Sequence, residues 1–165
     1  MLNNIRIKLA AIIQRKLQNY INGRNPDFTV GTDYLQRWWI IPRNHLFNIY
    51  YHNFRISDDD RSFHDHMYMS ISIILENSYI EHTLTGKFYR SAGDMKLRLP
   101  KTLHRIEIPE GKECWTLFIT GPRVRTWGFQ VGAIVRNWLG FRTKSGWMPH
   151  TEYIEKYGEQ VNNKK

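Results

Sequence analysis

Residues 62–75 read SFHDHMYMSISIIL, and this stretch carries two signals. His64 and His66 stand two residues apart, and side chains at that spacing project from the same face of an extended strand. The isoleucine-rich run that follows favours a strand over residues 67–75. The stretch therefore predicts a β fold in which two histidines can face one metal ion. The alternative is that both histidines are ordinary polar residues at a strand edge.

The same strand-like texture extends to both sides of this stretch. From Tyr34 to about Trp127, short runs rich in isoleucine, threonine and aromatic residues alternate with turn residues. Asn77-Ser78 is expected to be a tight hairpin turn between two of the strands. Many short strands at near-regular spacing predict an all-β sandwich or small barrel. We expect strands over 34–41, 46–56, 67–75, 79–85, 94–99, 103–108 and 114–120.

The chain of 165 residues is of ordinary size for a single domain. Residues 1–26 are expected to form an amphipathic helix, because apolar residues recur there at steps of three and four. Residues 34–150 are expected to form the β domain, whose last part, beyond Trp127, lacks a regular pattern. Residues 151–165 are expected to form a short helix and a frayed tail.

A third histidine, His104, stands at the start of a predicted strand, 38 residues after His66. Two histidines on one strand and a third on a neighbouring strand can hold a divalent metal and leave positions open for water or substrate. We therefore expect His64, His66 and His104 to be metal ligands. Iron, manganese, nickel and zinc all remain open as the ion.

The HDH pair, followed by strands and then by Gly93 and His104, resembles the two-motif signature of the cupin superfamily. More narrowly, SDDDRSFHDH, ILENSYIEH, LHRIEIP and CWTLFITGPRVRTWGF are similar to small RmlC-like cupin proteins of phages and bacteria. The resemblance implies a single cupin-like β-barrel, or jelly roll, with an N-terminal amphipathic helix and an irregular C-terminal segment. It says less about the reaction, because cupins include oxygenases, isomerases, decarboxylases, storage proteins and sugar-sensing modules.

The chain departs from the cupin pattern at the metal-binding carboxylate. The glutamate of the first motif falls on Ser70 or Ile71, so three of the four ligands are kept. A hairpin at Asn77-Ser78 would place Glu81 opposite Ile74, roughly 13 Å along the strand from Ser70, which is too far for a direct ligand. Glu81 is instead the candidate catalytic residue, as a polar group inside the barrel. A solvent-facing strand position is the alternative for it.

Other polar residues near the motifs have a functional and a structural interpretation. Asp58 could orient an imidazole, but a charged surface loop is the interpretation we favour. Arg90 and Arg98 could bind an anion, but an exposed cationic strand face is the commoner explanation. His82 is expected to face outward, and Cys114 is expected to be a buried, inert thiol.

Three hypotheses for function follow. Neutral imidazoles leave a bound divalent ion with its full positive charge, which favours anionic or chelating substrates and, with iron, O₂ activation. The leading hypothesis is therefore a metal-dependent small-molecule enzyme such as an iron oxygenase, and the cupin resemblance extends this to a dioxygenase. The alternative is a non-catalytic cupin module that binds a sugar, another small ligand or a partner protein. A homodimer is compatible with both.

The third hypothesis concerns the net charge of +9, which belongs to the two flanks of the chain. Residues 1–26 and 114–151 each carry +5 without any acid, whereas the middle is almost neutral. These flanks could associate with nucleic acid or an anionic membrane, although a solvated surface is the commoner explanation. The single cysteine cannot form an internal disulfide, so a cytoplasmic location is expected.

Overall fold

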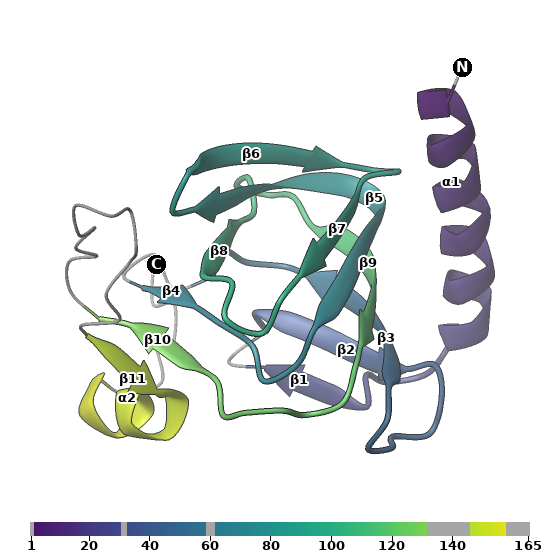
Figure 1. Ribbon diagram of the computed structural model, residues 1–165. Coiled ribbons are helices and arrows are strands. Elements are labelled where there is room, and N and C mark those ends of the chain that lie inside the picture. Colours follow the sequence, from purple (N-terminus) through teal and green to yellow (C-terminus); the bar gives the residue numbers. More distant parts are fainter. Residues whose placement is uncertain (1, 31–32, 59–61, 132–145, 158–165) are drawn as a thin grey trace.

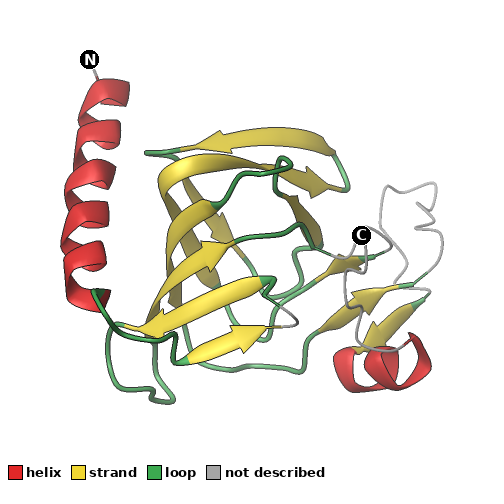
Figure 2. Ribbon diagram, turned by 180° about the vertical axis from the view of Figure 1, so that it is seen from behind, coloured by secondary structure: helices red, strands yellow, loops and turns green. Residues whose placement is uncertain are grey.

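The computed structural model describes residues 2–30, 33–58, 62–131 and 146–157. These residues form a mostly-β molecule with helix α1 (Leu2–Ile21) at one end and helix α2 (His150–Tyr157) at the other (Figures 1 and 2). Neither of these helices is long and apolar enough to cross a membrane. The strands are β1 (Phe28–Val30), β2 (Leu35–Trp39), β3 (Asn48–Phe54), β4 (Phe63–His64), β5 (Ser70–Thr83), β6 (Gly86–Ser91), β7 (Met95–Arg98), β8 (His104–Glu107), β9 (Cys114–Thr120), β10 (Gly128–Gln130) and β11 (Trp147–Pro149).

The strands form one antiparallel sheet that curls around an interior (Figure 1). Neighbouring strands follow the order β1-β2-β3-β9-β5-β8-β4-β10-β11, and β6 and β7 also pair with β5. The expected strands 34–41, 46–56 and 114–120 are present as β2, β3 and β9. The all-β, barrel-like prediction is thus confirmed. Residues 132–145, in the segment expected to be irregular, and the expected tail beyond residue 157 lie outside the described residues.

Strand β5 corrects the hairpin expected at Asn77-Ser78. It is one strand of 14 residues, whose first half pairs with β7 and β9 and whose second half pairs with β6 and β8. The register against β9 shifts between Ile74 and Glu76, and Asn77 has a φ of 59°. The residues Asn77-Ser78 do change the direction of the chain, but they form a bulge and a bend within one strand. The strand continues because other strands pair with it on both sides.

Helix α1 covers part of the outer face of the sheet. Ala10 and Ile21 of the helix are buried in one apolar cluster with Trp38, Tyr51 and Trp115 of three neighbouring strands. Polar contacts fix the helix in place, because Gln14 accepts from the Tyr51 hydroxyl at 2.9 Å and donates to Glu76 at 2.5 Å. The helix thus docks through both apolar and hydrogen-bonded contacts.

Gly93 allows the N-terminal half of α1 to approach the sheet. It has a φ of +93°, and a Cβ atom at this position would lie 3.0 Å from the backbone nitrogen of Ile7. A side chain there would meet helix backbone, which cannot move as a flexible side chain can. The glycine is therefore required by the packing of α1 as well as by the turn.

Inside the curled sheet, residues from five strands form a second apolar cluster. Cys114 belongs to it and is fully buried, as expected. Burial, followed by the negative charges of Glu113 and Glu76, raises the pKa of this thiol to about 12. The cluster consists of Leu35, Phe54, Ile74, Tyr79, Ile106, Ile108 and Cys114.

Candidate metal centre

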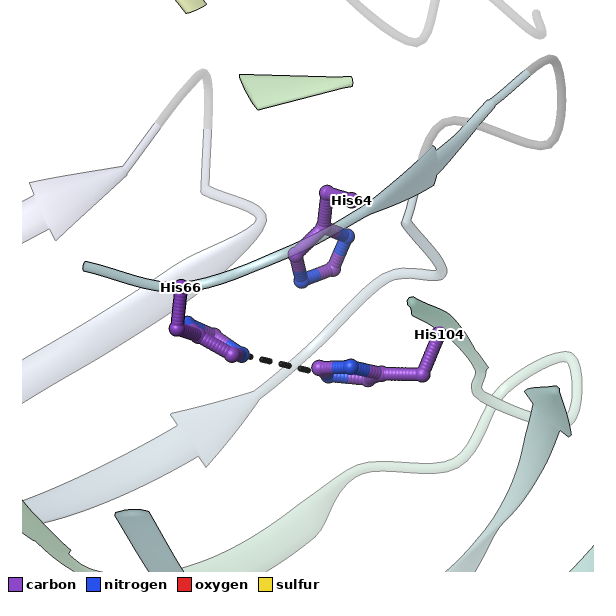
Figure 3. A group of neighbouring side chains, drawn as sticks. All are labelled: His64, His66 and His104. Atoms are coloured by element: carbon purple, nitrogen blue, oxygen red, sulfur yellow. Dashed lines mark hydrogen bonds between the residues drawn. The ribbon is translucent and has the colours of Figure 1, made fainter. Parts of the chain in front are cut away.

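The three predicted histidines come together in the folded chain. His64 ends β4 and pairs directly with His104, the first residue of β8, while His66 follows two residues after His64. One ring nitrogen from each residue lies within 4.8 Å of the others. Figure 3 shows the three imidazoles converging from two separate segments. The two-residue spacing and the pairing of β4 with β8 are what bring them together.

Hydrogen bonds orient the imidazoles toward one another. Nε2 of His66 lies 3.3 Å from Nε2 of His104 (Figure 3). On the other side of the His104 ring, Nδ1 lies 3.4 Å from the carbonyl oxygen of Thr102. A proton on Nδ1 that is donated to a carbonyl leaves Nε2 as a lone-pair donor to an ion. The arrangement therefore suits His104 to metal ligation through Nε2.

Asp58 lies behind His64 and corrects the interpretation of its segment as only a charged surface loop. It is buried, and its Oδ2 lies 3.6 Å from Nδ1 of His64. The same oxygen accepts from the backbone nitrogen of Ile106 at 2.6 Å, and the other accepts from the Tyr34 hydroxyl. Asp58 thus joins the segment before β4 to β8 and lies where a carboxylate can orient an imidazole.

Asp65, between the two histidines of the motif, projects away from them. Its carboxylate accepts from Arg125 at 2.6 Å, from the backbone nitrogen of Gly128 at 2.9 Å and from the Trp147 indole at 3.0 Å. Asp65 is fully buried. It therefore anchors the motif to β10 and β11 while the neighbouring histidines face the opposite way.

The protonation state of the cluster suits a divalent ion. Burial, followed by the nearby His64 and Arg98, holds the pKa of both His66 and His104 well below the ordinary value. Both rings are therefore neutral at physiological pH, which is the state that a metal ligand requires. Within the described residues, the cluster contains three histidines and no carboxylate. Three imidazole nitrogen donors fit iron, manganese, nickel or zinc.

The histidines line a cavity of about 500 Å³, a size typical of small-molecule sites. Strands of the curled sheet form most of the wall, and α2 contributes Tyr153 and Ile154. Further lining residues are mostly apolar or aromatic: Phe28, Val30, Tyr34, Leu35, Phe54, Met67, Tyr68, Ile106, Phe118, Trp127 and Phe129. The polar ones besides the three histidines are Arg37, His52, Ser57, Asp58, Ser62, Ser72, Arg98 and His150.

Glu81 faces inward, which decides between the two orientations that the sequence left open. It is fully buried, and its carboxylate accepts from Arg98 at 2.9 Å and from Arg90 at 2.9 Å. Arg98 lines the cavity, whereas Glu81 does not. Glu81 is therefore separated from the cavity by its arginine partner, and the catalytic role expected of it stays a prediction.

Arg98 and His82 are both less exposed than expected. Arg98 is buried rather than part of a solvent-exposed cationic face, and it also donates to Ser72 at 2.9 Å and to Tyr79 at 3.2 Å. His82 lies on the other face of β5 but is covered by Glu107, whose Oε2 is 2.5 Å from its Nε2. Arg98 of β7 pairs with Ser70 in the first half of β5, whereas His82 lies in the second half, which has a strand on each side.

Two further polar residues of the cavity, Arg37 and His52, are absent from the sequence-based site. They face each other across β2 and β3, and Nε of Arg37 donates to Nε2 of His52 at 2.8 Å. A signal for them exists, because Arg37 stands two residues after inward-facing Leu35 and His52 two residues before inward-facing Phe54. Strand alternation thus places both side chains on the inner face.

Comparison with known proteins places the fold among the cupins. The sequence matches no protein-family model and no curated protein. The structure is similar to KdgF from Halomonas sp., with a TM-score of 0.51 and 17% identity over 63% of this chain and 94% of that one. It is also similar to an RmlC-like cupin from Shewanella frigidimarina NCIMB 400, with a TM-score of 0.50 and 16% identity over 61% of this chain and 86% of that one. At these identities the likeness establishes the fold alone.

Proposed function

We propose that this protein is a metal-binding cupin that uses His64, His66 and His104 to hold a divalent ion and to act on a small molecule in the adjoining cavity. The observation that carries the proposal is the convergence of three ring nitrogens within 4.8 Å at the wall of a cavity large enough for a ligand. The neutral state of His66 and His104 and the Thr102 contact behind His104 support it further. Our finer proposal is an iron-dependent oxygenase.

The residues around the site have separate tasks in this proposal. A divalent ion supplies Lewis-acid chemistry when bound, and iron in addition supplies redox chemistry with O₂. Asp58 and Asp65 hold the two segments that carry the histidines, and the mostly apolar wall offers contacts to the body of a small molecule. The non-catalytic alternative uses the same cavity and the same ion without turnover.

Metal content is the direct test. Protein purified without an affinity tag and reconstituted with iron, manganese, nickel or zinc is expected to retain one of them stoichiometrically through gel filtration. His64→Ala and His104→Ala should lose it, whereas His45→Ala, which changes an exposed histidine outside the cluster, should not. Metal retention that is equal in all four proteins would remove the proposed site.

Turnover separates the oxygenase from the non-catalytic module. The iron form is expected to consume O₂ when supplied with small organic acids, and His104→Ala is expected not to do so. Iron that is bound stoichiometrically without any O₂ consumption would favour the binding module.

We also propose that α1 binds an anionic membrane surface. Leu2, Ile5, Leu9 and Ile12 are between 45% and 73% exposed, on the side of the helix away from the sheet. The basic side chains of Arg6, Lys8, Arg15 and Lys16 accompany them, and residues 1–26 contain no acid. An exposed apolar stripe among basic residues is the pattern of a helix that lies on anionic lipid. A symmetric contact with a second copy would instead bring like charges together.

A further inference from the structure

Arg37 is a partly buried cation in the cavity wall without a carboxylate partner among the described residues. Its Nε donates to His52, and its guanidinium carbon lies 4.7 Å from the centre of the Tyr50 ring. Its two terminal NH₂ groups make no hydrogen bond to a described residue. Burial lowers the pKa of Arg37, but a guanidinium keeps its charge in proteins. A partly buried charge with no described acid beside it favours a ligand that neutralises it.

Arg98, the other arginine of the described cavity wall, has both an acid and hydrogen-bond acceptors of the protein as partners. It forms a buried ion pair with Glu81 at 2.7 Å and also donates to Ser72 and Tyr79. Its charge is thus compensated by the protein itself. Arg37 has no such acid among the described residues, so its positive charge is available to the contents of the cavity.

His52 adds a second donor beside Arg37. Burial, followed by the charge of Arg37, holds the pKa of His52 well below the ordinary value, so the ring is neutral. Since Nε2 accepts from Arg37, the ring proton lies on Nδ1. This Nδ1 is buried and has no hydrogen-bond partner among the described residues. Arg37 and His52 therefore present donors but no negative charge.

The position of this pair relative to the histidine cluster defines a two-ended site. Both residues line the same cavity as the three histidines, and the rings of His52 and His66 both lie against Phe118, at centroid distances of 5.0 and 6.0 Å. The other lining residues of the cavity are largely apolar. A ligand that fills the cavity would therefore meet a cation at one end, the histidines at the other, and apolar side chains along its body.

We propose that Arg37 binds the carboxylate of a small organic acid whose opposite end reaches the three histidines. The inference deepens the proposed metal-dependent function and rests on it for the second end of the ligand. The planar guanidinium matches a carboxylate through its two terminal NH₂ groups, which are the donors that His52 leaves free. A neutral molecule of the same shape would leave the charge of Arg37 unpaired and should bind more weakly.

Paired probes test the proposal on the full-length chain. Acetate, butyrate, benzoate and phenylacetate are each titrated beside the corresponding primary amide, with backbone amide chemical shifts as the readout. We expect the wild-type protein to bind at least one of these acids more tightly than its amide. Arg37→Gln should lower the affinity for that acid by about tenfold or more, which is the loss expected for a charge-assisted hydrogen bond in a cavity. The affinity for the amide should not change.

Matched variants keep the test decisive. Arg43→Gln removes an exposed cation from the loop after the same strand and should leave binding of the acid unchanged. Arg37→Lys keeps the charge but loses the planar guanidinium, so it should lower the affinity for the acid less than Arg37→Gln does. If the spectrum of Arg37→Gln shows an unfolded protein, Arg37→Lys is used in its place. A lower affinity for the acid in Arg37→Lys than in Arg43→Gln then supports the proposal.

Titrations of chelator-treated and metal-reconstituted protein separate this inference from the metal site. A preference for acid over amide that survives chelation supports Arg37 even if the histidines bind no metal. Equal binding of acids and amides by the wild-type protein would overturn the role of Arg37 and leave the metal assay untouched. Equal losses in Arg37→Gln and Arg43→Gln would overturn it as well.

Discussion

At the scale of single residues, the HDH motif divides two tasks between alternating side chains. His64 and His66 point toward His104, whereas Asp65 points the other way and holds Arg125 and Trp147. The strand period of two makes this division possible within three residues. Positions next to a metal-binding histidine thus contribute to the site by fixing the backbone that carries it.

Glu81→Gln should destabilise the protein, because it leaves the buried charge of Arg98 without its carboxylate. We expect a loss of about 3 kcal/mol in the free energy of unfolding, measured by urea denaturation. Glu107→Gln is the matched control, since Glu107 pairs with His82 at a partly exposed position, and it should cost less than about 1 kcal/mol. The double variant Glu81→Gln, Arg98→Met should recover part of the loss. Equal costs for Glu81 and Glu107 would contradict the buried pair.

Because of Cys114, the free energy of unfolding is expected to fall as the pH rises above about 9. Its pKa is about 12 in the folded protein against 9.0 ordinarily, so the folded state keeps a proton that the unfolded state releases. The stabilisation is complete below pH 9 and is lost between about pH 9 and 12, at about 1.4 kcal/mol per pH unit. In urea denaturation at pH 9 to 11, Cys114→Ala should lose stability less steeply than the wild type. Parallel curves for the two proteins would argue against a raised thiol pKa.

At the scale of elements, the sequence pattern predicted α1 correctly but did not predict the full course of β5. The apolar spacing of α1 predicted the helix correctly, because a helix is specified by contacts three and four residues apart. Strand β5 departs from its local signal, because its residues pair with β6 and β7, which follow it in the chain, and with β8 and β9, which are far away in sequence. The same bend carries Glu81 to Arg98 and so builds the inner wall of the site.

The exposed stripe of α1 is expected to bind vesicles that contain phosphatidylglycerol and not vesicles of phosphatidylcholine alone. Cosedimentation should weaken as salt rises, because the basic side chains contribute attraction to anionic lipid. Ile5→Glu combined with Leu9→Glu should abolish binding. Leu46→Glu, which changes an exposed apolar residue of a loop, should leave it intact. Absence of binding together with a dimer that the double variant dissociates would show that a second copy covers the stripe.

At the scale of the whole molecule, the histidine cluster lies where the C-terminal strands join the curled sheet. β4 has only two residues, and His64 pairs with His104 of β8 on one side and with Phe129 of β10 on the other. Few residue pairs of the sheet therefore hold this junction together, besides the contacts of Asp58 and Asp65. An ion bound by histidines of both β4 and β8 would add a cross-link there, so metal binding should be visible in global stability.

Metal removal is therefore expected to lower thermal stability. With free metal at a hundred times its dissociation constant, binding to the folded state adds about 2.7 kcal/mol. The midpoint of thermal unfolding should fall on chelation and recover on reloading. His104→Ala should show no such difference. A chelator effect of equal size in that variant would place the bound metal elsewhere.

Much of the site could be predicted because its signals are local. The spacing of His64 and His66 fixes their common face on any extended segment, and His104 follows a turn region at the start of a strand. The positions of Arg98 and His82 could not be predicted, because burial of a charged strand residue depends on what covers the strand. Arg37 and His52 were missed for a related reason: alternation places them on one face but does not say that this face encloses a cavity.

The sequence by itself determined the strand-rich class, the N-terminal helix, the buried thiol and the three histidines, since each depends on spacing along the chain. Only the tertiary structure decided that β5 runs on through Asn77, that Glu81 is bound by Arg98, and that Arg37 faces a cavity with no acid beside it in the part of the chain that the structure describes. These features depend on pairing between distant strands, and the energy of a buried charge is set by the neighbours that such pairing supplies.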